Sequence, residues 1–193
     1  MRLAILDTGH RFGTKVLFAL IRAGSRQPVA GPVKLIMYRP DFFGAHLKTL
    51  THEAMRGPSA WSVADRELMA AFVSKMNDCE YCIKAHTAVA ARAYQDPARV
   101  SAVLADLETA PIEEPLRATL RLLRKLIGEQ RVDVDDMHTL LAAGVSRSQI
   151  EDALGVACAF DVMNRLADAF EFSIPGPEAF EAGAKYVLAH GYR

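Results

Sequence analysis

Two cysteines and a histidine stand at a spacing that could support redox chemistry. Cys79 and Cys82 are separated by two residues, and His86 follows four residues after the second cysteine. Each residue of an α-helix advances about 100° around the axis, so the three side chains would fall within roughly 60° of one another and share one pocket. A pair of thiols beside a base can react with a peroxide or a disulfide and then close into a disulfide of its own. The spacing therefore predicts thiol redox chemistry.

The first cysteine is expected at the start of a helix. Asn77 or Asp78 can provide the N-cap, which puts Cys79 within the first turn. The unpaired amide groups of that turn favour negative charge and lower the pKa of a thiol. We therefore expect the helix to assist ionisation of Cys79.

Proton transfer would fall to His86 and a carboxylate. His86 stands four residues after Cys82, where it could accept the thiol proton or stabilise the thiolate as an imidazolium. A base usually needs a partner that orients it, and the best candidate is Glu67, on the preceding helix and twelve residues before Cys79. Glu67 alone reads as a solvated helix residue, and only its spacing from the cysteines assigns it to the site.

The complete spacing resembles a known active site. A Glu, eleven residues, Cys-x-x-Cys, three residues and a His form the active-site pattern of the alkylhydroperoxidase AhpD branch of the carboxymuconolactone decarboxylase family. The residues that match this pattern in type and spacing are Glu67, Cys79, Cys82 and His86. The resemblance covers residues 59–94. It implies an all-α, AhpD-like helical bundle that is an oligomeric thiol peroxidase.

The resemblance also implies a role for each residue. Cys82 attacks the peroxide oxygen and becomes a sulfenic acid, and Cys79 then condenses with it to form a disulfide and release water. Glu67 and His86 serve as the proton relay. The chain departs from AhpD at Tyr81, where AhpD has a second histidine. Tyrosine can donate a hydrogen bond but is a poor base at neutral pH, so Tyr81 is expected to modulate the site and weaken peroxide turnover.

A polar cluster is expected beside the thiols. Residues 161–168 resemble the helix that follows the core in peroxidase-related members of the family. Within them Asn164 and Arg165, near Asp168, could form a buried cluster that supports the pocket. We interpret its role as structural rather than catalytic.

Composition indicates one ordinary domain without a polyanionic partner. The chain has 193 residues, 51% of them hydrophobic, which suffices for a substantial core. Its 23 basic and 23 acidic residues give a formal net charge of zero, so nothing favours nucleic acid or a membrane surface as a partner. A like-charge cluster that we interpret as a solvated helix face comprises Arg117, Arg121, Arg124 and Lys125.

The sequence predicts neither a membrane span nor a signal peptide. The apolar run 16–21 is too short to cross a bilayer and is flanked by Lys15 and Arg22. We therefore expect a cytoplasmic protein, in which a CxxC pair is more often catalytic or metal-binding than structural. The third cysteine, Cys158, lies in an apolar segment and is expected to be a small buried hydrophobe.

The chain reads as helix throughout, because no convincing run alternates β-branched and polar residues. We expect an all-α fold in a single domain over residues 1–193, with 1–40 as an N-terminal extension and 59–94 as the catalytic core. The expected helices cover residues 13–23, 41–56, 62–77, 78–94, 97–107, 113–130, 133–143, 146–170 and 177–190.

Two segments, 62–65 and 146–149, carry a capping box, in which the first side chain and the fourth bond each other's backbone. A shift of 84 residues aligns them and suggests two related helical halves, the second without thiols. In the second half we expect a break of the helix near Gly155 or Asp161.

Other interpretations of the CxxC pair stay open. A structural zinc site needs four ligands, usually from two separated pairs, and only Cys158 and scattered histidines remain for it. A carboxymuconolactone-decarboxylase-like enzyme would keep the fold, but such members generally lack the dithiol. The non-enzymatic alternative is a redox-sensing or zinc-binding interaction module.

The leading hypothesis is a thiol-dependent peroxide reductase of the peroxiredoxin type. It needs no metal and no organic cofactor. Its partners would be a small peroxide and an unidentified dithiol or protein reductant, with neither nucleic acid nor a membrane bound. The resemblance further implies a homo-oligomer, as a dimer, trimer or hexamer.

Overall fold

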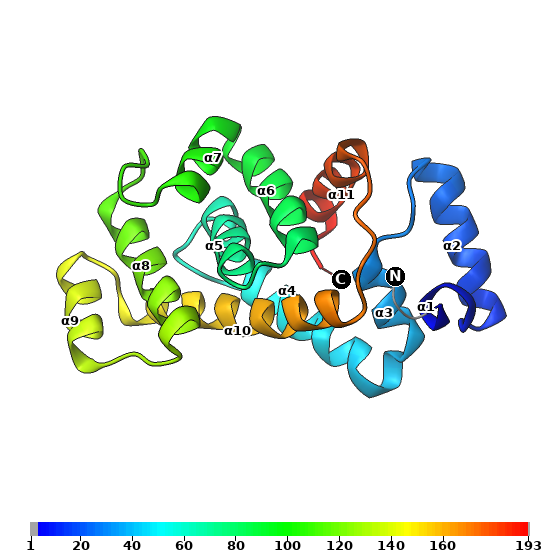
Figure 1. Ribbon diagram of the computed structural model, residues 1–193, viewed down its shortest axis with the longest axis horizontal. Coiled ribbons are helices and arrows are strands. Elements are labelled where there is room, and N and C mark those ends of the chain that lie inside the picture. The colour runs from blue at the N-terminus through cyan, green and yellow to red at the C-terminus, as the bar shows by residue number, and fades with distance from the viewer. Residues whose placement is uncertain (1–3, 193) are drawn as a thin grey trace.

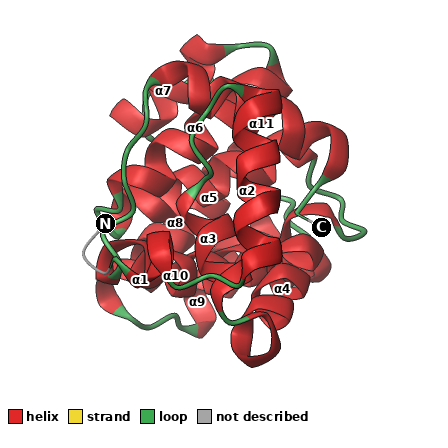
Figure 2. Cartoon of the chain, turned by 90° about the vertical axis from the view of Figure 1, so that its right-hand side faces the viewer, coloured by secondary structure: helices red, strands yellow, loops and turns green. Residues whose placement is uncertain are grey.

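The protein is all-α over residues 4–192, which the computed structural model describes. No strand occurs in this range (Figure 2), so the predicted fold class is confirmed. The elements, labelled in Figure 1, are α1 (Ile5–Thr8), α2 (Phe12–Ser25), α3 (Gly31–Tyr38), the π-helical turn η1 (Pro40–Gly44), α4 (Ala45–Arg56), α5 (Val63–Met76), α6 (Glu80–Tyr94), α7 (Pro97–Ala105), α8 (Glu114–Glu129), α9 (Val134–Ala142), α10 (Arg147–Ala169) and α11 (Pro177–His190).

The predicted capping boxes are confirmed and determine where α5 and α10 begin. The Ser62 hydroxyl accepts the Asp65 N–H at 3.0 Å, and the Asp65 carboxylate accepts the Ser62 N–H at 3.1 Å. Ser146 and Gln149 make the same reciprocal pair at 3.2 and 3.0 Å. Each box satisfies two backbone donors that have no partner inside the helix.

Helices α1 and α3 are absent from the sequence prediction. Helix α1 has only four residues, too few to show a helical period. Helix α3 starts at Gly31-Pro32, in a stretch of Gly and Pro that resembles a loop. A proline in the first turn of a helix costs no hydrogen bond, because that N–H has no partner within the helix.

The expected break in the helix after residue 146 is wrong. Helix α10 runs without interruption over 23 residues, through both Gly155 and Asp161. Position 161 corresponds, under the 84-residue shift, to the junction between α5 and α6, so α10 continues past the point where α5 ends. Even α10 carries charged side chains along its length, and within the described residues no helix is long and apolar enough to cross a membrane.

Helix α5 lies at the centre of the molecule. It packs against α4, α6, α7, α8 and α10 (Figure 1), and ten of its fourteen residues are buried. Helix α6 returns along α5 and is covered on another side by α11. Groups on α5 and the inner face of α6 are therefore shielded from water by the helices around them.

Helix α2 stands apart from this core (Figure 1). Phe18 is its one buried residue, and it lies against the ring of His10 at 4.8 Å. Several apolar side chains of α2 face solvent, the most exposed being Phe12 at 83% and Leu20 at 65%.

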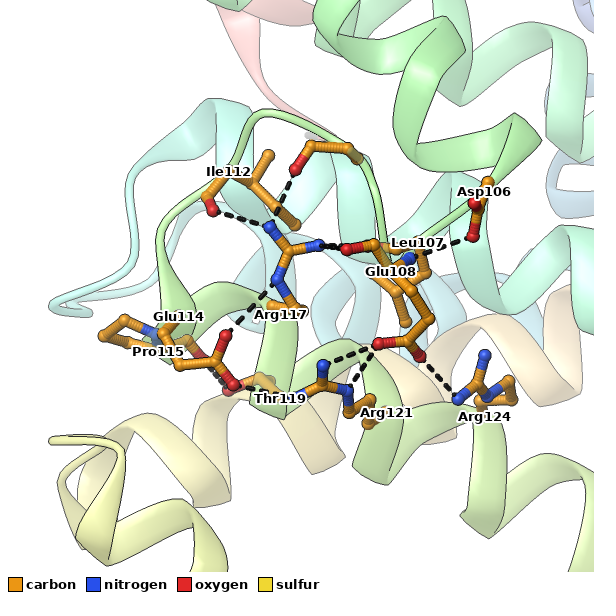
Figure 3. A network of polar contacts seen from close by, with 11 residues as sticks. Asp106, Leu107, Glu108, Ile112, Glu114, Pro115, Arg117, Thr119, Arg121 and Arg124 are labelled. Carbon is orange, nitrogen blue, oxygen red and sulfur yellow. Dashed lines mark hydrogen bonds and ion pairs between the residues drawn. The ribbon is translucent and has the colours of Figure 1, made fainter.

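The sequence suggested that Arg117 belongs to a solvated helix face, but the structure places it elsewhere. Its guanidinium donates to backbone carbonyls of the loop between α7 and α8, those of Leu107, Glu108, Ala110 and Ile112 (Figure 3). Four carbonyls without helical partners are thereby satisfied by one side chain. Arg124 is exposed, as expected, Arg121 is half-buried, and both pair with Glu108.

Candidate functional site

The first cysteine is placed by the way α5 ends. Asp78 has a left-handed backbone (φ 54°), and the Cys79 N–H bonds to the Ser74 carbonyl at 3.0 Å. This is the Schellman pattern that closes a helix, here with Asp at the position where Gly is usual. Cys79 itself becomes the N-cap of α6, so the expected cap at Asn77 or Asp78 is wrong. The chain turns within two residues, because one helix ends where the next begins.

The two thiols of the motif are buried and contact each other. Cys79 is fully buried and Cys82 is 2% exposed. The Cys82 thiol donates a hydrogen bond to the Cys79 sulfur, which lowers the pKa of the Cys79 thiol and raises the pKa of Cys82. Burial raises the pKa of both. The pair therefore accommodates one negative charge, and in this arrangement the charge lies on Cys79.

The position of the negative charge bears on the roles that the resemblance implies for the two cysteines. Those roles make Cys82 the attacking sulfur, whereas the hydrogen bond favours the thiolate of Cys79 in the reduced protein. A shift of the shared proton from Cys82 to Cys79 reconciles the two, since it moves the charge without moving any heavy atom.

Part of the predicted polar cluster surrounds the thiols. Asn164 is buried on α10, donates to the Ser74 hydroxyl at 3.0 Å and accepts from Asn77 at 3.1 Å. Its amide also contacts Cys82 and lowers the pKa of that thiol, which the negative charge of Asp168 opposes. Arg165 does not belong to the cluster. It is exposed and pairs with Asp161 at 3.2 Å.

The predicted carboxylate lies against the predicted base. Glu67 is fully buried, and its Oε2 lies 2.7 Å from His86 Nδ1. Arg56, from α4, donates to the other oxygen at 2.7 Å. Burial alone would raise the pKa of Glu67, but the hydrogen bonds and charges of His86 and Arg56 outweigh it, so the pKa lies below its ordinary value. Glu67 is therefore a carboxylate at neutral pH.

Sequence reasoning missed two residues that contact Glu67. Tyr192, after α11, donates to Oε1 at 2.9 Å and reaches Oε2 at 3.1 Å. Arg56 also covers the Tyr192 ring, with its guanidinium carbon 5.0 Å from the ring centroid. Neither residue lies within the region of resemblance, and a separation of 125 residues between Tyr192 and Glu67 leaves no local pattern to detect.

Tyr81 lies in an aromatic cluster with Phe172 and Phe180. Its ring packs edge-on against Phe172 at 5.5 Å and lies 5.7 Å from Phe180. Burial raises the pKa of Tyr81, as do the nearby sulfurs, while the backbone of Gly31 contacts its hydroxyl. The phenol is therefore neutral at physiological pH and cannot act as a base.

Cys158 is exposed, so the expectation that it is buried is wrong. The buried residues of α10 follow a helical seam that includes Ala153, Ala157 and Phe160. Cys158 falls outside that seam, because each residue turns about 100° from the one before it. The apolar residues around Cys158 belong to a helix that is buried on one face only.

The described residues provide no metal centre. Within residues 4–192, no three side chains among His, Cys, Asp and Glu converge in a way that could hold a metal ion.

Comparisons with known proteins show a similarity to one family and a shared fold. Residues 40–125 match the model of the carboxymuconolactone decarboxylase family. No curated protein matches the chain. Among solved structures, a peroxidase-related protein from Silicibacter sp. TM1040 has 23% identity and a TM-score of 0.75, with 88% of each chain covered. An AhpD-core, peroxidase-related protein from Ralstonia eutropha JMP134 has 22% identity and a TM-score of 0.74, with 93% of each chain covered.

A protein with a different activity shares the fold. The debrominase Bmp8 superposes with a TM-score of 0.67 at 15% identity, over 90% of this chain and 92% of its own. The architecture thus carries more than one chemistry, and only the residues of the site can separate them. Residues 40–125 are thus similar to the carboxymuconolactone decarboxylase family, and the fold of the chain is the all-α AhpD-like fold.

Proposed function

We propose that the protein is a thiol-dependent peroxide reductase in which Cys79 and Cys82 supply the two electrons. One observation supports this most: two buried thiols share a hydrogen bond at the start of α6, which also carries His86 and its Glu67 partner. A dithiol that lies so close can be oxidised in two steps without an added cofactor.

The reaction begins with one proton shared between the sulfurs. Moving that proton from Cys82 to Cys79 leaves a thiolate at Cys82, one helical turn from His86. The Cys82 thiolate attacks the nearer peroxide oxygen and the O–O bond breaks. The departing alkoxide takes a proton from the His86 imidazolium and leaves as the alcohol, with Cys82 oxidised to a sulfenic acid.

The second step closes the disulfide. The Cys79 sulfur attacks the Cys82 sulfenic acid, the S–O bond breaks, and the hydroxyl leaves as water with the Cys79 proton. The sum is one dithiol and one hydroperoxide converted to one disulfide, one alcohol and one water. An external dithiol, free or on a protein, then reduces the disulfide by thiol–disulfide exchange.

Glu67 and His86 provide the proton for the first step. A carboxylate 2.7 Å from Nδ1 balances the charge of an imidazolium and fixes the ring orientation. Because Glu67 has no exposed surface, water does not screen this pair.

The test is a titration of the reduced protein with a small organic hydroperoxide, with free thiols counted and peptides mapped. Two of the three thiols should disappear, as a single bond between Cys79 and Cys82. The Cys158→Ser variant is the matched control and should consume the same amount of peroxide. Intact thiols under these conditions would contradict the proposal and favour a decarboxylase-like enzyme or an interaction module.

The role of each sulfur is tested by trapping. Cys79→Ser should accumulate a sulfenic acid on Cys82 that a sulfenic-acid probe can label, while Cys82→Ser should not react with peroxide. Sulfenic acid on Cys79 in the Cys82→Ser variant would reverse the roles, in agreement with the resting charge on Cys79.

We also propose that the protein assembles as a homo-oligomer. The exposed apolar side chains of α2, chiefly Phe12 and Leu20, support this, since such a face costs free energy while it contacts water. Sedimentation of the native chain and of a Phe12→Asp, Leu20→Asp variant tests it. A smaller species in the variant is expected, and a monomeric native chain would contradict it.

A further inference from the structure

Tyr192 enters the site from a tight turn after α11. Its hydroxyl lies 2.9 and 3.1 Å from the two Glu67 oxygens and 3.4 Å from His86 Nδ1. Its ring lies roughly parallel to the His86 ring, with an interplanar angle of 27°. The phenol thus contacts both members of the proton relay from an element that carries neither.

The turn that delivers Tyr192 depends on a glycine. Gly191 has a positive φ of 68° with ψ −156°, and a Cβ there would lie 3.0 Å from the ring of His52. Only glycine adopts this conformation without strain. The hydrogen bond between the Arg56 guanidinium and the Val187 carbonyl, at 3.5 Å, ties the end of α11 to the same site.

Charged and titratable groups from several elements act on the Glu67 carboxylate. These are Arg56 from α4, Arg66 from α5 itself, His86 from α6, and Tyr192 after α11. Arg56 and His86 each hold one oxygen, and Tyr192 bridges both. Burial and the charge of Glu67 hold the pKa of Tyr192 well above its ordinary value, so its hydroxyl remains a donor throughout the physiological range.

We propose that Tyr192 is a positioning residue of the relay, which holds Glu67 as a carboxylate oriented toward His86. The assignment of the pair as a proton relay rests on the proposed function, but the hydrogen bonds do not. Without the hydroxyl, a fully buried carboxylate loses one of three donors and no water replaces it. Glu67 then protonates at a higher pH, and His86 loses the charge that fixes its ring.

The first test does not depend on peroxide chemistry. The ring nitrogens of His86 are followed by NMR from about pH 3 to about pH 8 in the native protein, in Tyr192→Phe and in Tyr186→Phe. Tyr186 is the matched control, because it lies on α11 and is 57% exposed. In Tyr192→Phe the acid transition that reports Glu67 should move up by about one pH unit, the tenfold change expected for one hydrogen bond to a charged group.

The second test measures the rate of peroxide-driven thiol oxidation across pH. Tyr192→Phe should be about tenfold slower near the acid limb and approach the native rate at alkaline pH. A purely structural role would lower the melting temperature of Tyr192→Phe and leave both pH profiles in place. Identical His86 titrations in all three proteins would overturn the inference. A native protein that peroxide does not oxidise would instead refute the proposed function and leave the NMR result valid.

Discussion

The segments α5–α6 and α10–α11 are built alike but contribute differently to the site. Both α5 and α10 begin with a capping box and end on a non-glycine residue with left-handed backbone, Asp78 (φ 54°) and Glu171 (φ 47°). In both, the N–H of the next residue, Cys79 or Phe172, bonds back to the carbonyl five residues earlier at 3.0 Å. The same local signals therefore start and stop the two helices.

The two helix ends lead into different connections. After Cys79 the chain enters α6 at once, whereas residues 173–176 separate Phe172 from α11 (Figure 1). The α5–α6 pair thus carries the groups expected to react, and α10–α11 carries residues that pack on them or hold them. The same type of helix end therefore supports chemistry in one place and packing in the other, according to the residue that it positions.

The largest effect is expected from breaking the relay on α5–α6. Glu67→Gln and His86→Ala should each slow peroxide-driven thiol oxidation by roughly 10²–10⁴-fold, the usual loss when a positioned proton-transfer group is removed. The double variant should be little slower than the slower single variant, because the residues act as a unit. Rapid mixing with thiol detection measures this, and Glu53→Gln on the surface of α4 is the control. If the losses of the two single variants multiply in the double variant, Glu67 and His86 act independently.

The next largest effect is expected when a side chain of the α10–α11 segment that packs on the site is removed. Phe172 is buried against Tyr81 and Gly31, so Phe172→Ala should lower the free energy of unfolding by about 3–5 kcal/mol through a cavity. Val134→Ala, at an exposed position of α9, is the control and should change the free energy of unfolding by less than about 0.5 kcal/mol. Denaturant titration measures both. Equal losses would mean that Phe172 does not support the site.

A third prediction concerns the charge on the thiols. In a Cys158→Ser background, one thiolate should form below the ordinary thiol pKa of 9.0, because Cys79 accepts the Cys82 proton in a hydrogen bond. The second thiol should stay protonated well above pH 9.0, since the pKa of Cys82 is raised. Ultraviolet absorbance of the thiolate across pH follows both steps. If both thiolates formed over the same pH range, the idea that the two sulfurs share one proton would be contradicted.

The smallest effect should come from the helix ends themselves. Asp78→Gly and Glu171→Gly relieve left-handed backbone and should each stabilise the protein by up to about 1 kcal/mol, as measured by thermal unfolding. Oxidation rates should be unchanged in both, because neither side chain belongs to the site. A slower Asp78→Gly variant would show that this turn does more than place Cys79.

Local signals in the sequence predicted most of the main helices. Capping boxes and Gly/Pro boundaries indicated the main helices, and the spacing from Glu67 to His86 selected two side chains that the structure places 2.7 Å apart. Such signals work because hydrogen bonds at helix ends are made between near neighbours in the chain. They fail for α1 and α3, which are too short or too rich in Gly and Pro to show a period.

Contacts between residues that are far apart in the chain could not be predicted from the sequence. Tyr192 reaches Glu67 across 125 residues, and only the packing of α11 on α6 brings them together. The prediction for Cys158 was wrong because an apolar run does not by itself give the helical phase, which puts residue 158 on the outer side of α10. The prediction for Arg117 was wrong for a related reason, since its partners are backbone carbonyls that no residue pattern reveals.

The burial of both sulfurs has a kinetic consequence. With Cys79 fully buried and Cys82 only 2% exposed, a reagent meets them only while the surrounding helices are parted. The observed rate is then the intrinsic rate multiplied by the open fraction, and at high reagent concentration it levels off at the rate of opening. That ceiling should be the same for small hydroperoxides of different reactivity. It would also set a lower bound on the lifetime of the reduced protein under sudden oxidative stress.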